Sequence, residues 1–410
     1  MNLLRKGGVT AWIIGALWAV TMSICVAIVI SFSTGRPLAP TLLSAAALGG
    51  LAGLALVARK GEGLALGRWL PVGGAFLVAI AAHIWDGPAM RGTAETGALW
   101  MAVAWAGFAA TVAGPLLVML KELQPGPNSR HDFEAAVIRF LTGFGYVFFT
   151  AIVAIPFYVM VMTSLKSQQA LLANPLDFSI DLSRGTDLFR SYVELFRDFN
   201  FGRYMAISAF VSVATVAITI LFSVPGAYAV SRLRFSGQAV MSRSILLIYM
   251  VPMIVLALPI YIGFSMLGLR NSVFGLLLIY PVTTIPVALY MLQGYFRGIP
   301  AEIEEAGLMD GLSRLKVIWK ITLPLSLPAL ASVSLYVFMI AWNEFLLAFM
   351  LLDDPSKFTL TRGVAMLNSS EIPRQHLMAG AVIATVPIMV LFLGLERFMT
   401  RGLTAGSVKG

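Results

Sequence analysis

The sequence contains little charge, one cysteine and three histidines, and each shortage excludes a class of protein. Charged residues make up 12% of the 410 positions, about half the share that a soluble domain carries. The single cysteine, Cys25, excludes an intrachain disulfide. The histidines, His83, His131 and His376, are far apart and show no metal-ligand spacing. We therefore expect a membrane protein without a metal site.

Motifs of nucleotide-hydrolysing and hydrolytic enzymes are also missing. No G-x-x-x-x-G-K-[ST] sequence occurs, so this chain is not itself a P-loop ATPase. There is no H-E-x-x-H, no G-x-S-x-G and no pair of intramembrane acids at catalytic spacing. We expect neither an enzyme nor a bound cofactor in this chain.

Long apolar runs dominate what is present. Hydrophobic residues make up 59% of the chain, and a helix that crosses a bilayer needs about 20 apolar residues in succession. Ten runs approach or exceed this length: residues 10–32, 40–58, 69–85, 97–120, 139–163, 204–230, 244–265, 272–295, 327–352 and 379–398. Because the runs are continuous rather than alternating, they exclude barrel strands. The predicted fold class is an all-α polytopic membrane protein.

The net charge of +9 is explained by the membrane rather than by nucleic acid. With a cytoplasmic N-terminus and ten spans, most of the 29 lysines and arginines fall on the cytoplasmic side, in agreement with the positive-inside rule. Arg5 and Lys6 precede an apolar run that is too long for a signal-peptide core, so we expect an uncleaved first span. Both termini are predicted to be cytoplasmic, with no nucleic-acid partner.

A polar segment with two prolines divides the chain into two blocks. Residues 121–138 are predicted to form a cytoplasmic linker between four spans in residues 1–120 and six spans in residues 139–410. In the first block, Gly49 and Gly53 have a spacing that lets helices approach closely. Whether they serve a dimer or only the packing common in membrane helices is left open.

Two features of the second block leave alternatives open. In the outside loop at residues 164–203, an amphipathic helix around 187–198 is expected to lie at the membrane surface or against a partner. Four prolines interrupt two of the predicted spans, either as hinges for alternating access or as ordinary kinks. They are Pro252, Pro259, Pro281 and Pro286.

Residues 300–324 place charge and glycine between two apolar spans. Pro300 suits the start of a helix. Three acids fall in its first turn, where the helix dipole favours negative charge: Glu302, Glu304 and Glu305. Asp310 and Gly311 form a turn pair that ends this helix.

A second short helix is expected after this turn. Ser313 can cap it, and Leu323-Pro324 is expected to end it before the next span. Its apolar face consists of Leu315, Ile318 and Trp319. An inside loop has no lipid core to cover such a face, so the face requires either the membrane interface or another protein.

The spacing of this segment also carries a family resemblance. Glu305-Ala306-Gly307 is followed after three residues by Gly311 and after nine more by Ile321-Thr322-Leu323-Pro324. This resembles the EAA loop of ABC-importer permeases, Glu-Ala-Ala, three residues, Gly, nine residues, Ile-x-Leu-Pro. Gly307 replaces the usual second alanine, which loosens the first helix without removing the acid or the hinge.

The resemblance implies that this loop docks into a cleft on a separate ATPase subunit. The residues assigned to coupling are Glu304, Glu305, Ala306, Gly307, Asp310, Gly311, Ile321, Leu323 and Pro324. ATP-driven closure of the ATPase pair would then push the loop and rearrange the spans.

The likeness extends over residues 139–410 and is closest to the second permease of maltose-type importers. Further stretches that carry it are SLKSQQALLANP (164–175), FGRYMAISAF (201–210), GAYAVSRLRFSG (226–237), AWNEFLLAF (341–349) and GLTAGSVKG (402–410). Ile207-Ser208 departs from the Asn-Ser usual in the family. The first four spans lie outside the likeness.

This family likeness implies a six-helix permease core in the cytoplasmic (inner) membrane of a bacterium. It also implies the partners of such a core. They are a second permease, two ATPase subunits that bind ATP and Mg, an extracytoplasmic solute-binding protein, and a sugar substrate that is a di- or oligosaccharide.

One acid lies within a predicted span. Glu344 follows Asn343 in the outer half of residues 327–352, and Tyr336, Met339 and Asn343 share one helical stripe. A carboxylate within the bilayer is costly and is a functional candidate for that reason. These four residues either contact a sugar or tie the helix to its neighbours, and both interpretations stay open.

The sequence therefore predicts the translocation subunit of a sugar importer driven by ATP that is hydrolysed elsewhere. The alternative is an ion-coupled secondary transporter, which would usually carry ionisable groups near the bilayer midplane. Glu344 alone is thin support for it, and residues 300–324 would then have no explanation.

Overall fold

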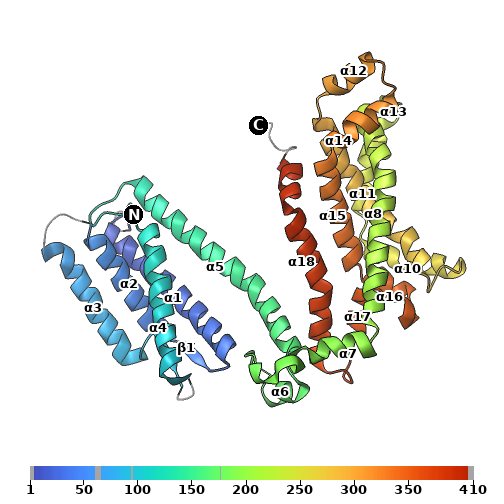
Figure 1. The fold of residues 1–410 in the computed structure, drawn as a ribbon. Coiled ribbons are helices and arrows are strands. Elements are labelled where there is room, and N and C mark those ends of the chain that lie inside the picture. The colour runs from blue at the N-terminus through green and yellow to red at the C-terminus, as the bar shows by residue number, and fades with distance from the viewer. Residues whose placement is uncertain (1–3, 61–65, 94–95, 176, 405–410) are drawn as a thin grey trace. The chain divides into compact units, whose positions relative to one another are not determined.

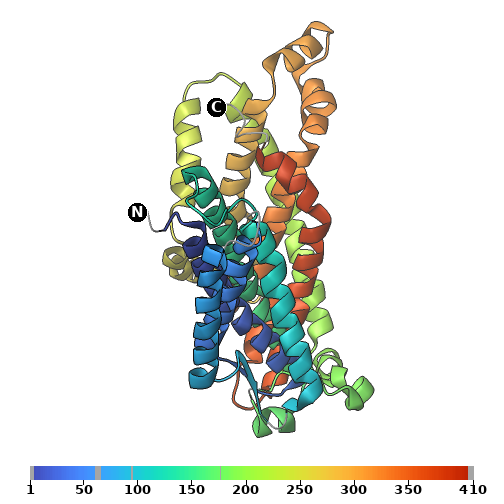
Figure 2. The same ribbon diagram turned by 90° about the vertical axis from the view of Figure 1, so that its left-hand side faces the viewer.

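The computed structural model describes residues 4–60, 66–93, 96–175 and 177–404. Of the C-terminal stretch 402–410, residues 405–410 lie outside the described part. The chain divides into two compact units, residues 1–188 and 189–410, and both are largely helical (Figures 1 and 2).

Each predicted apolar run is formed largely by one or two helices. Among the described residues, seven helices are long and apolar enough to cross a membrane: α1 (Gly7–Thr34), α3 (Leu66–Asp86), α4 (Gly97–Met119), α5 (Arg130–Ser164), α8 (Phe201–Arg232), α11 (Val273–Gly298) and α18 (Arg374–Thr404). A bent pair, Arg314–Leu325 with α15 (Leu327–Asn343), gives an eighth when the pair is counted as one span. Two apolar helices are shorter, α2 (Leu42–Ala58) and α10 (Met253–Met266). The all-α polytopic prediction is confirmed.

Two of the predicted runs are broken rather than continuous. The run at 244–265 is divided between α9 (Gln238–Tyr249) and α10, because extended backbone at Pro252 separates the two helices. The run at 327–352 breaks at Glu344, whose ψ of 122° ends α15 before α16 (Leu346–Leu351) begins. By contrast, Pro259, Pro281 and Pro286 lie inside helices.

The first unit is built around the pair α1 and α2. A Cβ on Gly15 would lie 2.2 Å from the carbonyl oxygen of Gly49, and one on Gly53 would lie 2.2 Å from that of Ala11. These glycines therefore permit close backbone approach within the chain. Beyond the helices, β1 (Leu38–Pro40) pairs antiparallel with β2 (Met90–Gly92), and α6 (Gln168–Ala173) follows α5.

In the second unit, α11 packs along α8, and α15 packs against both α8 and α18. The amphipathic helix expected around 187–198 is α7 (Arg190–Asp198), preceded by a 3-10 helix (η2, Leu182–Phe189). Its face with Ser191 and Leu195 is buried, and α7 packs against α18 and α8. Two short elements, η4 (Pro355–Lys357) and α17 (Leu360–Met366), precede α18.

The segment between α11 and α15 forms one end of this unit. It contains α12 (Ala301–Met309), α13 (Arg314–Val317), a π-helical turn (η3, Ile318–Thr322) and α14 (Leu323–Leu325). Within the second unit, α12 and α13 lie at the end opposite α7 and α17 (Figure 1). They project beyond the neighbouring helix ends (Figure 2), so their outer surface is accessible for contact.

Candidate functional site

The segment 300–324 begins as its sequence indicates. Pro300 has extended backbone, and α12 starts at the next residue with Glu302 and Glu304 in its first turn, whereas Glu305, also expected there, follows that turn. The helix ends at Met309 with Asp310 as its C-cap, and Gly311 has a φ of +82°, a left-handed conformation that favours glycine. Ser313 occupies the N-cap position of α13 but makes no side-chain capping bond.

The expected stop at Leu323-Pro324 is not where the helix ends. The helical path continues through η3 and α14, and a bend of 75° follows between Leu325 and Leu327. Pro324 is tolerated because it stands in the first turn of α14, where its missing N–H costs little. Pro328 stands in the same way in the first turn of α15, just after the bend.

Glu304 is the anchor of the segment. Its side chain is buried, and its Oε1 accepts a 2.9 Å hydrogen bond from the hydroxyl of Thr322, within the same segment. Oε2 accepts a 3.1 Å bond from the hydroxyl of Tyr228, near the end of α8. Arg232 Nε lies 3.6 Å from Oε1 and supplies the opposite charge that a buried carboxylate needs.

Arg232 also binds the backbone just before the segment begins. Its guanidinium donates a 2.5 Å hydrogen bond to the carbonyl oxygen of Ile299. Sequence reasoning missed both Tyr228 and Arg232 as site residues. The sequence offered one signal for them, the acids of the segment. If one of these acids is buried, it requires a cation and hydrogen-bond donors from outside the loop.

Most of the other residues assigned to coupling are exposed. Glu305, Ala306, Asp310, Gly311 and Pro324 lie on the surface, whereas Ile321 and Leu323 are half-buried. Large apolar side chains accompany them at the surface: Ile303 (40% exposed), Met309 (88%), Leu315 (67%) and Trp319 (68%). The outer face of the segment is therefore a mixture of acidic and apolar groups.

Gly307 is packed rather than free. A Cβ at this position would lie 2.6 Å from Cδ1 of Ile321, with Val317 and Leu312 close behind. The departure from alanine thus makes room for the Ile321 side chain between α12 and η3. The segment is held together by Glu304 and by this contact.

The four residues considered for the substrate pathway lie toward the far end of α15. Tyr336 and Met339 are half-buried, and the exposed Asn343 donates a 2.9 Å hydrogen bond to the carbonyl oxygen of Met339. The carboxylate of Glu344 accepts bonds from the backbone N–H groups of Leu347 (2.8 Å) and Ala348 (3.1 Å). Glu344 therefore caps α16, and contact of these residues with substrate stays a prediction.

The sequence matches a described family and several known proteins. Residues 223–404 match the family described as binding-protein-dependent transport system inner membrane component. The chain is 37% identical over 270 residues to the inner membrane ABC transporter permease protein YcjP of Escherichia coli (strain K12), covering 65% of this chain and 95% of that protein. It is 32% identical over 282 residues to the trehalose/maltose transport system permease protein MalG of Thermococcus litoralis, covering 68% and 99%.

The fold is also similar to a solved structure. A chain from the crystal structure of a bacterial ABC transporter involved in the import of the acidic polysaccharide alginate superposes with a TM-score of 0.55 at 25% identity. The match covers 66% of this chain and 98% of that one.

These findings confirm the resemblance inferred from the spacing around Gly311, and with it a translocation subunit rather than an enzyme. The matched relatives are covered almost end to end by about two thirds of this chain. The chain belongs to the family of binding-protein-dependent transport system inner membrane components, the permease subunits of ABC importers.

Proposed function

We propose that this chain is a permease subunit of an ATP-driven importer of di- or oligosaccharides, coupled to a separate ATPase through residues 300–324. The observation that carries the coupling proposal is the burial of Glu304 among Tyr228, Arg232 and Thr322. This anchor fixes α12 to the end of α8 while it leaves Leu315 and Trp319 exposed.

The same anchor gives the coupling a mechanism. Force applied to the exposed face of α12 and α13 reaches α8 through the Tyr228 and Arg232 contacts with Glu304. It reaches α15 through the continuous path of η3 and α14, across the bend at Ser326. Two membrane helices would therefore move together when the ATPase pair closes, as alternating access requires.

The substrate class is proposed from the relatives. Permeases similar to this chain are named for trehalose/maltose, trehalose and diacetylchitobiose transport. Hydrogen-bonding and aromatic side chains suit a sugar. For this chain we propose Tyr336, Met339, Asn343 and Glu344 as candidates along its path.

The remaining assignments concern the assembly. The partners would be a second permease, two ATPase subunits that bind ATP and Mg, and an extracytoplasmic solute-binding protein. We place the chain in a bacterial inner membrane with both termini cytoplasmic, because its lysines and arginines are concentrated on that side. The permease core would comprise residues 139–410, with 1–120 as an added helical block and 121–138 as a linker.

Copurification tests the coupling proposal. We would express the tagged chain, solubilise the membranes gently and identify the bound proteins for the parent and for Glu305→Lys. Glu371→Lys is the matched control, since it reverses an exposed acid outside the segment. The expected result is an ATPase that copurifies with the parent and the control but is lost from Glu305→Lys at an unchanged membrane level.

A different outcome would favour the ion-coupled alternative. If no ATPase copurifies and Glu305→Lys still transports, the segment is an interfacial element only. Uptake measured after ATP depletion and after collapse of the ion gradient then decides between the two energy sources.

A further inference from the structure

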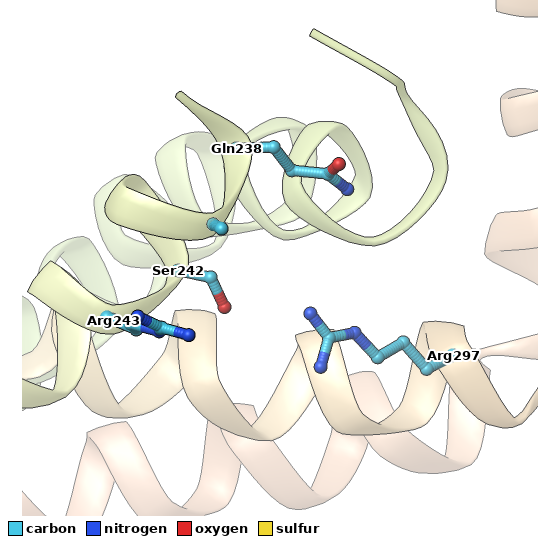
Figure 3. A pocket seen from close by; sticks show the side chains of 5 residues that line it. Gln238, Ser242, Arg243 and Arg297 are labelled. Atoms are coloured by element: carbon cyan, nitrogen blue, oxygen red, sulfur yellow. The ribbon is translucent and has the colours of Figure 1, made fainter. Parts of the chain in front are cut away.

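A cavity of ≈ 360 Å³ lies between α9 and the last turn of α11. Its lining residues are Gln238, Ala239, Ser242, Arg243 and Arg297. Figure 3 shows Arg297 extending from α11 toward Ser242 on α9, where Arg243 is the next residue. The two arginines come from different helices, so the cavity collects positive charge from two sides.

Both arginines are exposed, and neither has an acidic partner among the described residues. In the part of the chain that the structure describes, no acid lines the cavity and neither Arg243 nor Arg297 forms an ion pair. The nearby Arg232 differs, because it already forms an ion pair with Glu304 and donates a hydrogen bond to the carbonyl oxygen of Ile299. Two free guanidinium groups beside one cavity are complementary to an anion with several oxygens.

A neutral donor is fixed beside the arginines. Nε2 of the buried Gln293 donates a 2.6 Å hydrogen bond to Oγ of Ser242, which leaves the hydroxyl hydrogen of Ser242 available. Gln238 donates a 2.7 Å bond from Nε2 to the carbonyl oxygen of Val230, so its side chain is also held in place. A phosphate group fits this set, since it accepts bidentate bonds from arginine and a further bond from a hydroxyl.

Exposed apolar side chains stand close in sequence to the residues that line the cavity. On α9, exposed side chains flank it in sequence: Val240, Met241 and Leu247. On α11, Tyr290 is exposed two turns before Arg297. An anion with attached acyl chains would bury this surface, whereas free phosphate would leave it uncovered.

The cavity lies at the end of the second unit that carries residues 300–324, since Arg297 stands three residues before Pro300. We propose that it binds the phosphate group of an anionic phospholipid of the cytoplasmic leaflet. The proposal uses the orientation given under the proposed function but needs neither the ATPase contact nor the sugar. It assigns α9 and α11 a lipid that bridges them at the level of the headgroups.

Lipid binding to the purified full-length chain, with whatever partners copurify, tests the proposal. We would titrate phosphatidylglycerol, phosphatidylcholine and inorganic phosphate separately and measure bound lipid by native mass spectrometry and the shift in Tm. The parent is expected to bind phosphatidylglycerol in preference to phosphatidylcholine. The double variant Arg243→Gln/Arg297→Gln is expected to weaken that binding at least about tenfold, because two charge-assisted contacts are lost.

The control removes the same charge elsewhere. Arg59→Gln/Arg234→Gln changes two exposed arginines that do not line the cavity, and its phosphatidylglycerol binding is expected to equal that of the parent. Each single variant is measured as well. If the double variant does not fold, the single variants still test the proposal.

Three results would overturn the proposal. They are equal binding of both lipids, parental binding by Arg243→Gln and by Arg297→Gln, and an inorganic phosphate effect that matches phosphatidylglycerol at equal concentration. The last result would assign the cavity to free phosphate. Loss of the ATPase from Glu305→Lys is a separate readout, so failure of the coupling proposal would not be confused with failure of this one.

Discussion

The hydroxyl of Tyr228 donates a 3.1 Å hydrogen bond to Oε2 of Glu304 and so joins the end of α8 to the first turn of α12. Thr322 donates to the other carboxylate oxygen of the same residue. Three segments of the chain therefore converge on one buried acid. The orientation of the exposed face around Trp319 depends on that convergence.

Tyr228→Phe is predicted to loosen α12. The change removes one hydrogen bond to a charged acceptor, which is worth about 1.5–3 kcal/mol, while it retains the aromatic ring. Hydrogen exchange in residues 301–309 should therefore increase. Tyr290→Phe is the matched control, because Tyr290 is exposed on α11 and its loss should leave that exchange unchanged. Unaltered exchange in Tyr228→Phe would contradict the anchoring role.

The two glycines of the segment are predicted to respond differently to alanine. Gly311 has a φ of +82°, so Gly311→Ala should destabilise the turn by about 1–2 kcal/mol. In Gly307→Ala, the one close contact of the new Cβ, at 2.6 Å, is with the end of the flexible Ile321 side chain, and the helix gains up to about 1 kcal/mol in propensity. Unfolding in detergent should show a loss for Gly311→Ala alone. Equal losses of stability in the two variants would contradict this prediction. They would show that added volume at position 307 destabilises the segment as much as the strained backbone at position 311 does.

The local features of this segment were predictable from the sequence. Pro300, the acids after it and Gly311 each act within one helical turn, so their effects appear in consecutive letters. The contact between Tyr228 and Glu304 spans 76 positions and has no periodic signature, so only the folded structure gives it. The charge and the spacing indicated a docking surface but not what holds that surface in place.

The breaks in two apolar runs were not predictable for a related reason. A run such as 244–265 satisfies the length of a membrane span whether it is continuous or broken. Pro252 marked a place where a break is allowed, yet Pro281 and Pro286 lie within α11 without ending it. Neighbouring helices decide which proline ends a helix. For the same reason the pairing of β1 with β2, between distant loops, had no local signal.

Acidification is predicted to release α7 from α18. The Nε of Arg190 (2.8 Å) and the Nε2 of His376 (2.7 Å) contact the carboxylate of Glu194, and these hydrogen bonds hold the pKa of that carboxyl below its ordinary value. A lowered folded pKa stabilises the contact above the unfolded value of about 4.3. That stabilisation is lost as the pH falls through the lower folded pKa.

Hydrogen exchange in residues 190–198, followed from neutral pH to below about 4, measures this effect. After correction for intrinsic exchange, the parent should show added opening in the acidic range, and Glu194→Gln should show it already at neutral pH. Glu371→Gln, an exposed acid near the start of α18, is the matched control and should behave as the parent does. A parent whose α7 opens no more at acidic pH would refute the prediction.

Glu344 is predicted to act first as a cap of α16. Glu344→Ala leaves the N–H groups of Leu347 and Ala348 without their acceptors, at a cost of about 1–3 kcal/mol each where they are buried. Glu344→Gln keeps one acceptor oxygen and should lose clearly less stability. Unfolding of the purified protein measures both changes, with Asp354→Asn as a control that alters a half-buried cap on a different element.

Transport kinetics of Glu344→Gln then separate the two interpretations of this acid. If Glu344 only ties α16 to α15, a folded Glu344→Gln protein should keep the parental KM for sugar, because nothing that touches substrate has changed. If it also contacts substrate, KM should rise while Tm changes little, since an amide replaces a charged acceptor for sugar hydroxyls at the same position. Parental stability of Glu344→Ala together with a parental KM of Glu344→Gln would contradict both roles, because the carboxylate would then serve neither the helix nor the sugar.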